Sequence, residues 1–148
     1  QQNFIIFIQS LERFDECLLR KPIGEGKWSV IEIIGHFCPW DEFVLQKRIP
    51  YLLTGERLPK GPKADDLNTH SSFLARTEVV ENTFEKCIRI RKELLSKLSQ
   101  IPEDNWLIEL HINHSNLTLY NYLKGLMEHD LHHIQQIKST LNNEIGGV

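Results

Sequence analysis

Residues 128–137 read Glu-His-Asp-Leu-His-His-Ile-Gln-Gln-Ile and contain three of the seven histidines of the chain. The stretch belongs to a long segment without proline, in which apolar residues recur at the three- and four-residue spacing of an amphipathic helix. His129 and His133 are four residues apart, so a helix places both imidazoles on one face, one turn apart. Helices carry histidine pairs at this spacing to chelate one divalent metal ion.

A helical wheel separates His132 from this pair. With His129 at zero and about 100° per residue, the apolar residues of the segment centre near +100°. His133 falls at about +40°, on the edge of the apolar arc, whereas His132 falls at about −60°, outside it. We therefore predict that His129 and His133 form the pair and that His132 faces solvent or a partner. The alternative is a surface helix that carries histidines by chance, and a third ligand is needed to decide.

The composition indicates one folded domain over residues 1–148. Hydrophobic residues make up 41% of the chain and charged residues 25%, which excludes a disordered or fibrous protein. The formal net charge is −3 and no basic run is present, so nothing favours binding to nucleic acid. No apolar run approaches the roughly 18 residues that cross a bilayer, so we expect no membrane association.

The cysteines indicate the compartment. Cys17, Cys38 and Cys87 are odd in number, widely spaced and placed within helical patterns. Such a set argues for buried thiols in a reducing compartment and against a disulfide framework. We therefore expect a cytoplasmic protein.

Two helices are predicted in the first third of the chain. Residues 3–20 carry apolar residues at helical spacing, and the proline and glycines of residues 21–26 break the pattern. The second helix begins at Ser29, which forms a capping box with Glu32, and Gly55 is placed to end it.

Two further helices follow. The third is predicted over residues 71–100 and is closed by Pro102. Thr118 is a plausible cap for the fourth, which continues to about Asn143, before Gly146 and Gly147.

The segments between these helices are long and polar. Residues 56–68 read as a loop, and residues 101–117 are irregular, with a possible short extended piece at residues 107–111. The sequence therefore predicts an all-α four-helix bundle with long connections after helices 2 and 3.

A third metal ligand is expected from another helix, because bundles build metal sites from side chains on facing helices. His70, His111 and His114 lie in loops or at a loop junction, where we expect them to be solvated. His36 lies inside the second predicted helix, on the edge of its apolar arc, as His129 and His133 are on theirs. Pro39 should bend that helix within a turn of His36.

Two stretches, Gly26–Phe37 and His129–Ile137, resemble the DinB-like (DinB/YfiT) superfamily of four-helix metal proteins. The resemblance covers nearly the whole chain, with both motifs in the same order and on the corresponding helices. It implies that His36, His129 and His133 bind a divalent metal. It also implies a homodimer, for which Ile31, Leu45 and Ile49 offer exposed-looking aliphatic side chains on the back of the second helix.

Other residues near these motifs have roles to weigh. His129-Asp130-x-x-His133 comes close to the zincin pattern, but Asp130 falls in the middle of the apolar arc, so we reject a metalloprotease. Asp130 is expected to satisfy a buried donor, either a helix terminus or the free ring nitrogen of a ligand histidine.

Three other groups are candidates for the pocket. Gln136, one turn beyond His133, is either a contact of the ligands or substrate or an ordinary surface residue. Trp40, one turn after His36, is expected to wall the pocket. Cys38 and Cys87 are disfavoured as ligands, because a buried cysteine usually acts as a small hydrophobe.

Three imidazoles leave an open position on a metal, and two chemistries follow from it. A small thiol of the bacillithiol, mycothiol or glutathione type could attack an electrophilic substrate as thiolate, which is the activity that the resemblance favours. The alternatives are hydrolysis of small amides or esters, and a metal-binding stress-response protein without turnover. The donor set suits zinc or nickel first, with iron, cobalt or manganese possible.

Overall fold

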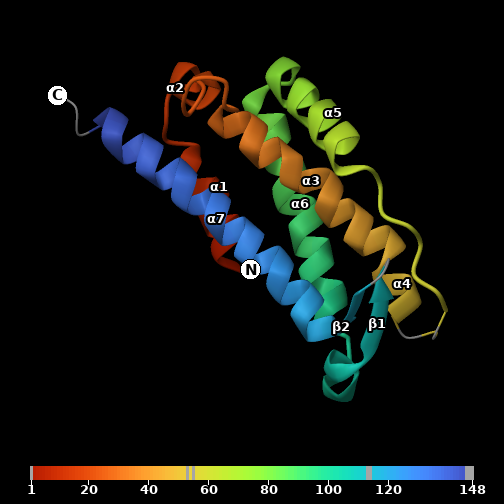
Figure 1. Cartoon of the computed structure of the whole chain (residues 1–148). Helices are drawn as coiled ribbons and strands as arrows, with labels where there is room; N and C mark the ends of the chain where they lie inside the picture. The colour runs from red at the N-terminus through yellow and green to blue at the C-terminus, as the bar shows by residue number, and fades with distance from the viewer. Residues whose placement is uncertain (1, 53, 55, 113–114, 146–148) are drawn as a thin grey trace.

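Four helices form the bundle in the computed structural model (Figure 1): α1 (Gln2–Leu11), α3 (Val30–Lys47), α6 (Val80–Leu98) and α7 (Leu119–Ile145). The structure describes residues 2–52, 54, 56–112 and 115–145. α1 packs against α6 and α7, and α3 packs against the same two helices. The predicted four-helix bundle is confirmed, and α3 and α7, which carry the histidines, are neighbours in it.

The start of α3 follows from its capping residues. The Ser29 hydroxyl accepts a hydrogen bond from the Glu32 backbone amide, and the Glu32 carboxylate accepts from the Ser29 amide and hydroxyl. The predicted capping box is therefore confirmed. Residues 30–38 of the helix are all buried, and the helix continues through Pro39 to Lys47, where α4 (Ile49–Leu52) follows.

The prediction of one helix over residues 3–20 is wrong. The chain leaves α1 at Leu11 and starts α2 (Glu16–Arg20) after Asp15, whose carboxylate accepts from the Cys17 amide and caps the new helix. Cys17 is exposed, not buried as expected. An N-terminal cap inside an apolar pattern interrupted the helix that periodicity alone would continue.

The predicted helix over residues 71–100 is also two helices, α5 (Ala64–Thr77) and α6. α5 begins inside the segment 56–68 that was predicted to be a loop. It ends where the Arg20 guanidinium donates to the backbone carbonyls of Ala75, Arg76 and Glu78. Because this cap comes from a side chain more than fifty residues away, the local pattern contains no sign of the break.

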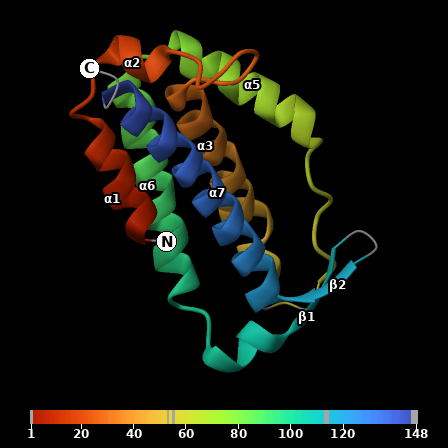
Figure 2. The same ribbon diagram turned by 60° about the vertical axis from the view of Figure 1, so that its left-hand side comes forward.

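α5 packs along α3, on the side away from α1, as Figures 1 and 2 show. Gly35 permits this approach, because a Cβ at that position would lie 2.6 Å from the Cβ of Ala75. The residue before His36 is therefore a glycine for a packing reason.

The connection from α6 to α7 contains structure that the sequence indicated only in part. After a 3₁₀ turn (Glu103–Leu107), β1 (Glu109–Ile112) pairs with β2 (Ser115–Thr118) in an antiparallel hairpin, with Leu110 opposite Leu117. The expected extended piece overlaps β1, whereas β2 was not predicted. Thr118 accepts a hydrogen bond from the Asn121 amide at 3.1 Å, as expected of a cap for α7.

Two groups of buried side chains fill the bundle. One joins α1, α3, α6 and the C-terminal half of α7, and the other lies toward the hairpin. Ile31 is fully buried in the first group, and Leu45 and Ile49 pack against the second. The expectation of an exposed side chain is therefore wrong for Ile31, whereas Leu45 and Ile49 keep part of their surface exposed.

Some expectations lie outside the described residues: the helix ends at Gly55 and at Gly146 and Gly147, and the environment of His114. Among the described residues, no helix is long and apolar enough to cross a membrane.

Candidate metal centre

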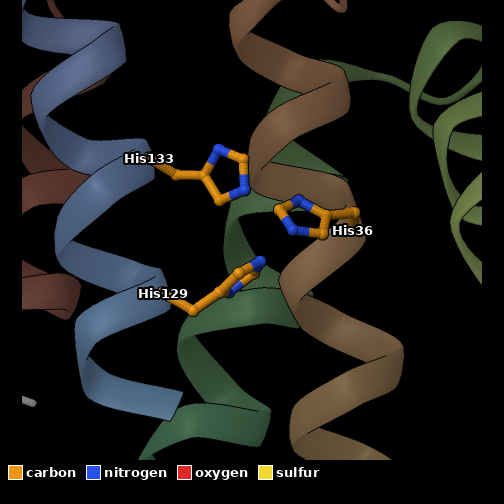
Figure 3. Close-up of side chains that lie close together, drawn as sticks. All are labelled: His36, His129 and His133. Carbon is orange, nitrogen blue, oxygen red and sulfur yellow. The ribbon is translucent and has the colours of Figure 1, made fainter. Parts of the chain in front are cut away.

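Three histidines converge between α3 and α7 (Figure 3). α3 supplies His36, and α7 supplies His129 and His133 from successive turns of one face. One ring nitrogen from each residue lies within 4.8 Å of the other two, and this group could hold a metal ion. Nitrogens bonded to one ion at about 2.1 Å lie roughly 3.4 Å apart at tetrahedral angles, so small ring movements would suffice.

The three side chains differ in their exposure. His36 is 1% exposed, His133 is half-buried and His129 is exposed. The His36 ring lies against Phe37, with ring centroids 4.4 Å apart, and against Trp28 at 5.3 Å. The group therefore has a closed, aromatic side on α3 and is open to solvent along α7.

Hydrogen bonds orient two of the rings. Nδ1 of His36 lies 2.5 Å from the Ile33 carbonyl, and Nδ1 of His133 lies 2.8 Å from Oε1 of Gln136. Both oxygens can only accept, so each Nδ1 carries the proton and each Nε2 has its lone pair free. A donated Nδ1–H of this kind fixes the tautomer and orientation of histidines that bind metals. Gln136 thus contacts one of the three histidines, as the first of its two interpretations expected.

The imidazoles are held in their neutral form. Burial, together with a smaller effect of His133 and His129, lowers the pKa of His36 from 6.5 to about 3, against the hydrogen bond to Ile33. Burial also lowers the pKa of His129 and of His133. Neutral imidazole is the form that binds a metal, so at neutral pH no proton competes with the ion.

A buried ionic cluster lies directly beside the histidines. Arg91 of α6 donates to both carboxylate oxygens of Asp41 on α3, at 2.5 and 3.1 Å, and to Asp130 on α7 at 2.6 Å. Burial disfavours the charged guanidinium, but the two carboxylates outweigh it and raise the pKa of Arg91. The Phe4 ring covers the guanidinium at 3.9 Å. We call these three charged residues the arginine cluster.

The arginine cluster corrects the expectation for Asp130. Asp130 does satisfy a buried donor, but the donor is a guanidinium and not a helix terminus or an imidazole. Arg91 and Asp41 were not singled out from the sequence. The available signal was a charged residue, Arg91, within the apolar stripe of its helix, between Cys87 and Leu94.

Trp40 does not wall the histidine group in the expected way. Its indole donates to Oδ1 of Asn68 on α5 at 2.9 Å, and its ring contact is with Phe43. The tryptophan that contacts His36 is Trp28, which stands just before the Ser29 cap. The difference arises because α5 packs on α3 and offers Trp40 a partner there.

The remaining candidates stay apart from the group. His132 is exposed, and its ring centroid lies 5.3 Å from that of His133. His70 and His111 are exposed. Cys38 and Cys87 are buried with their Sγ atoms 2.9 Å apart, and this hydrogen bond and burial raise the pKa of Cys87. Neither thiol belongs to the histidine group.

Comparison with known protein families identifies the family of this chain. Residues 3–137 match the sequence pattern of the DinB superfamily. The chain belongs to this superfamily. Comparison with curated protein sequences gave no match.

Two solved structures share the fold. YfiT from Bacillus subtilis, described as a probable metal-dependent hydrolase with an unusual four-helix bundle topology, superposes with a TM-score of 0.74 and 16% identity. That match covers 98% of this chain and 87% of YfiT. A mycothiol-dependent maleylpyruvate isomerase superposes with a TM-score of 0.68 and 16% identity, over 97% of this chain and 65% of the isomerase.

Proposed function

We propose that this DinB superfamily protein binds one divalent metal through His36, His129 and His133. The donor set supports the proposal: three neutral imidazoles, at least two with Nε2 free, from two helices that other contacts hold together. Three nitrogen ligands suit zinc and nickel, and also iron, cobalt and manganese. Three protein ligands leave room for a further one, which is the arrangement of a reactive site.

We further propose that the protein transfers a small thiol to an electrophilic substrate. When bound, a divalent ion would supply Lewis acidity, which favours the thiolate form of a coordinating thiol. In the transfer, the sulfur forms a bond to the electrophilic carbon, the leaving group departs with its bonding pair, and the thiol proton passes to solvent. The exposed flank at His129 gives such a cosubstrate access to the histidine group.

The observation that carries this choice is the engagement of two buried carboxylates that lie near the histidines in sequence. Asp130, next to His129, is buried and paired with Arg91. Glu32, one turn before His36, is buried and bound to Ser29, with Arg76 3.4 Å away. Neither carboxylate is free to assist hydrolysis as a general base on water, whereas thiolate transfer gains nothing from such a base.

Relatives with the same fold make both classes of chemistry reasonable. The isomerase is described as mycothiol-dependent, and YfiT as a probable metal-dependent hydrolase. Hydrolysis of small amides or esters is therefore the second candidate.

The test offers one metal-loaded preparation several small thiols with a model electrophile, and separately a panel of amides and esters without thiol. We expect thiol consumption that is lost in His129→Ala and kept in His132→Ala, the matched control on the same helix. Ester or amide turnover that depends on His129 and needs no thiol would favour the hydrolase. If neither panel shows turnover while metal is bound, the result would favour a metal-binding protein without catalytic activity.

We also propose a homodimer, as the family resemblance implies. Ile31 does not contribute to its interface, because it is fully buried inside the bundle, whereas Leu45 and Ile49 are only partly buried. A monomeric mass by light scattering across micromolar concentrations would contradict this proposal.

A further inference from the structure

A cavity lies at the C-terminal end of α3. Its volume is about 880 Å³, and it is lined by Arg48 at the end of α3, by residues 57–60, and by His111 and Ile112 of β1. The charged residues in this lining are Arg48, Arg57 and Lys60, and no carboxylate is among them. His36 and Arg48 are twelve positions apart in sequence, which corresponds to roughly 18 Å along a helix. The cavity is therefore separate from the histidine group.

Arg48 is the unusual member of the lining. It is only 4% exposed, and no carboxylate of the described residues lies within ion-pair distance. Its guanidinium donates to the Pro59 carbonyl and stacks on the Phe43 ring at 4.7 Å, and it lowers the pKa of Tyr122 against the larger effect of burial. Its Nε has no hydrogen-bond partner among the described residues.

A buried cation without a counter-charge is costly, because the loss of hydration is not repaid by an ion pair. Arg91 shows how the same chain treats the other buried arginine: two carboxylates pair with it. A group that binds to the cavity can supply to Arg48 the charge that the chain does not. Arg57 and Lys60 add positive charge at the exposed side of the cavity.

We propose that this cavity binds a small organic anion, with a phosphate or carboxylate group toward Arg48. A guanidinium suits such groups, because its planar array of donors matches two oxygens at once. Leu58, Pro59 and Ile112 provide contacts for an apolar body of the ligand. The volume lies within the usual range for small-molecule sites, roughly 300–1,000 Å³. The proposal does not depend on the metal site or on its chemistry.

The test follows the Nε–H resonances of the arginines by ¹⁵N–¹H NMR in the full chain, while phenyl phosphate, phenylacetate or chloride is added. We expect a saturable shift of the Arg48 Nε–H signal with one of the two organic anions, and no saturable shift with chloride. The anion that binds more tightly identifies the phosphate or the carboxylate group. Absence of saturation with both organic anions would overturn the proposal, as would saturation that shifts the Nε–H signals of other arginines and leaves that of Arg48 unchanged.

Variants locate the site. Arg48→Met should weaken binding at least 10-fold, and Arg57→Gln and Lys60→Gln several-fold each. Lys47→Gln, an exposed neighbour outside the lining, should leave binding unchanged. Should Arg48→Met fail to fold, the double variant of Arg57 and Lys60 decides the question. Equal weakening in Lys47→Gln would mean general charge attraction and would contradict a site.

Discussion

Two buried polar groups lie side by side in this bundle: one consists of paired charges and the other of neutral imidazole rings. The arginine cluster and the histidine group both take residues from α3 and α7, and Asp130 directly follows His129. In the arginine cluster the guanidinium is paired with two carboxylates, so the chain satisfies its own charges. In the histidine group the rings are neutral, and two of them keep a free Nε2. The first group holds helices together, and the second is available to a ligand.

The acid response of the metal-free protein should expose this difference most strongly. A histidine with a lower pKa in the folded state binds fewer protons when folded, so stability falls as the pH drops below 6.5. For His36, with its pKa at about 3, the loss would reach about 4 kcal/mol by pH 3. His129 and His133 act in the same direction.

Urea unfolding at several pH values, with metal removed, measures this loss. His36→Phe should flatten the dependence between pH 6.5 and 3 relative to the wild type. A variant with the same slope as the wild type would show that His36 is not held neutral by burial.

Removing the cation of the arginine cluster should cost nearly as much. Arg91→Met leaves Asp41 and Asp130 buried and unpaired, and we expect a loss of about 3–5 kcal/mol at neutral pH. Arg89→Met, an exposed arginine on the same helix, is the control and should change stability by less than about 0.5 kcal/mol. Similar losses in both variants would contradict the structural role given to Arg91.

These two groups also mark how far the sequence could predict the molecule. Helical spacing placed His36, His129 and His133 on the right faces, because each ligand helix is continuous around its histidines. The Arg91 contacts join residues 50 and 39 positions apart, and no local pattern encodes such pairs. The break between α5 and α6 could not be predicted for the same reason, because the distant Arg20 caps the end of α5. Trp40 was misplaced because the position of α5 was unknown.

The hydrogen bond to His133 gives a smaller, more local test. Gln136→Leu removes the acceptor for Nδ1–H, and we expect metal affinity to fall by about 10- to 100-fold. Calorimetric titration of metal-free protein with zinc measures it. Gln135→Leu, an exposed neighbour, should leave the affinity unchanged. Unchanged affinity in Gln136→Leu would mean that this contact does not orient the ligand.

Two glycine substitutions test the packing that supports both groups. Gly35→Ala would bring its Cβ to 2.6 Å from that of Ala75, and we expect a loss of about 1–3 kcal/mol as α5 is displaced from α3. Gly125→Ala meets no atom within 4 Å and lies inside α7, so it should stabilise by up to about 1 kcal/mol. Thermal unfolding of both variants measures these changes in stability. A stabilising effect of Gly35→Ala would contradict the close contact between α3 and α5.

Metal content per chain is the most direct test of the central claim. Untagged protein, loaded with zinc or nickel and dialysed, should carry one ion per chain by elemental analysis. His36→Ala, His129→Ala and His133→Ala should each lose that ion, while His132→Ala should keep it, because its exposed ring lies outside the group. Retention of the ion in His36→Ala, or an equal loss in His132→Ala, would contradict a site built from α3 and α7.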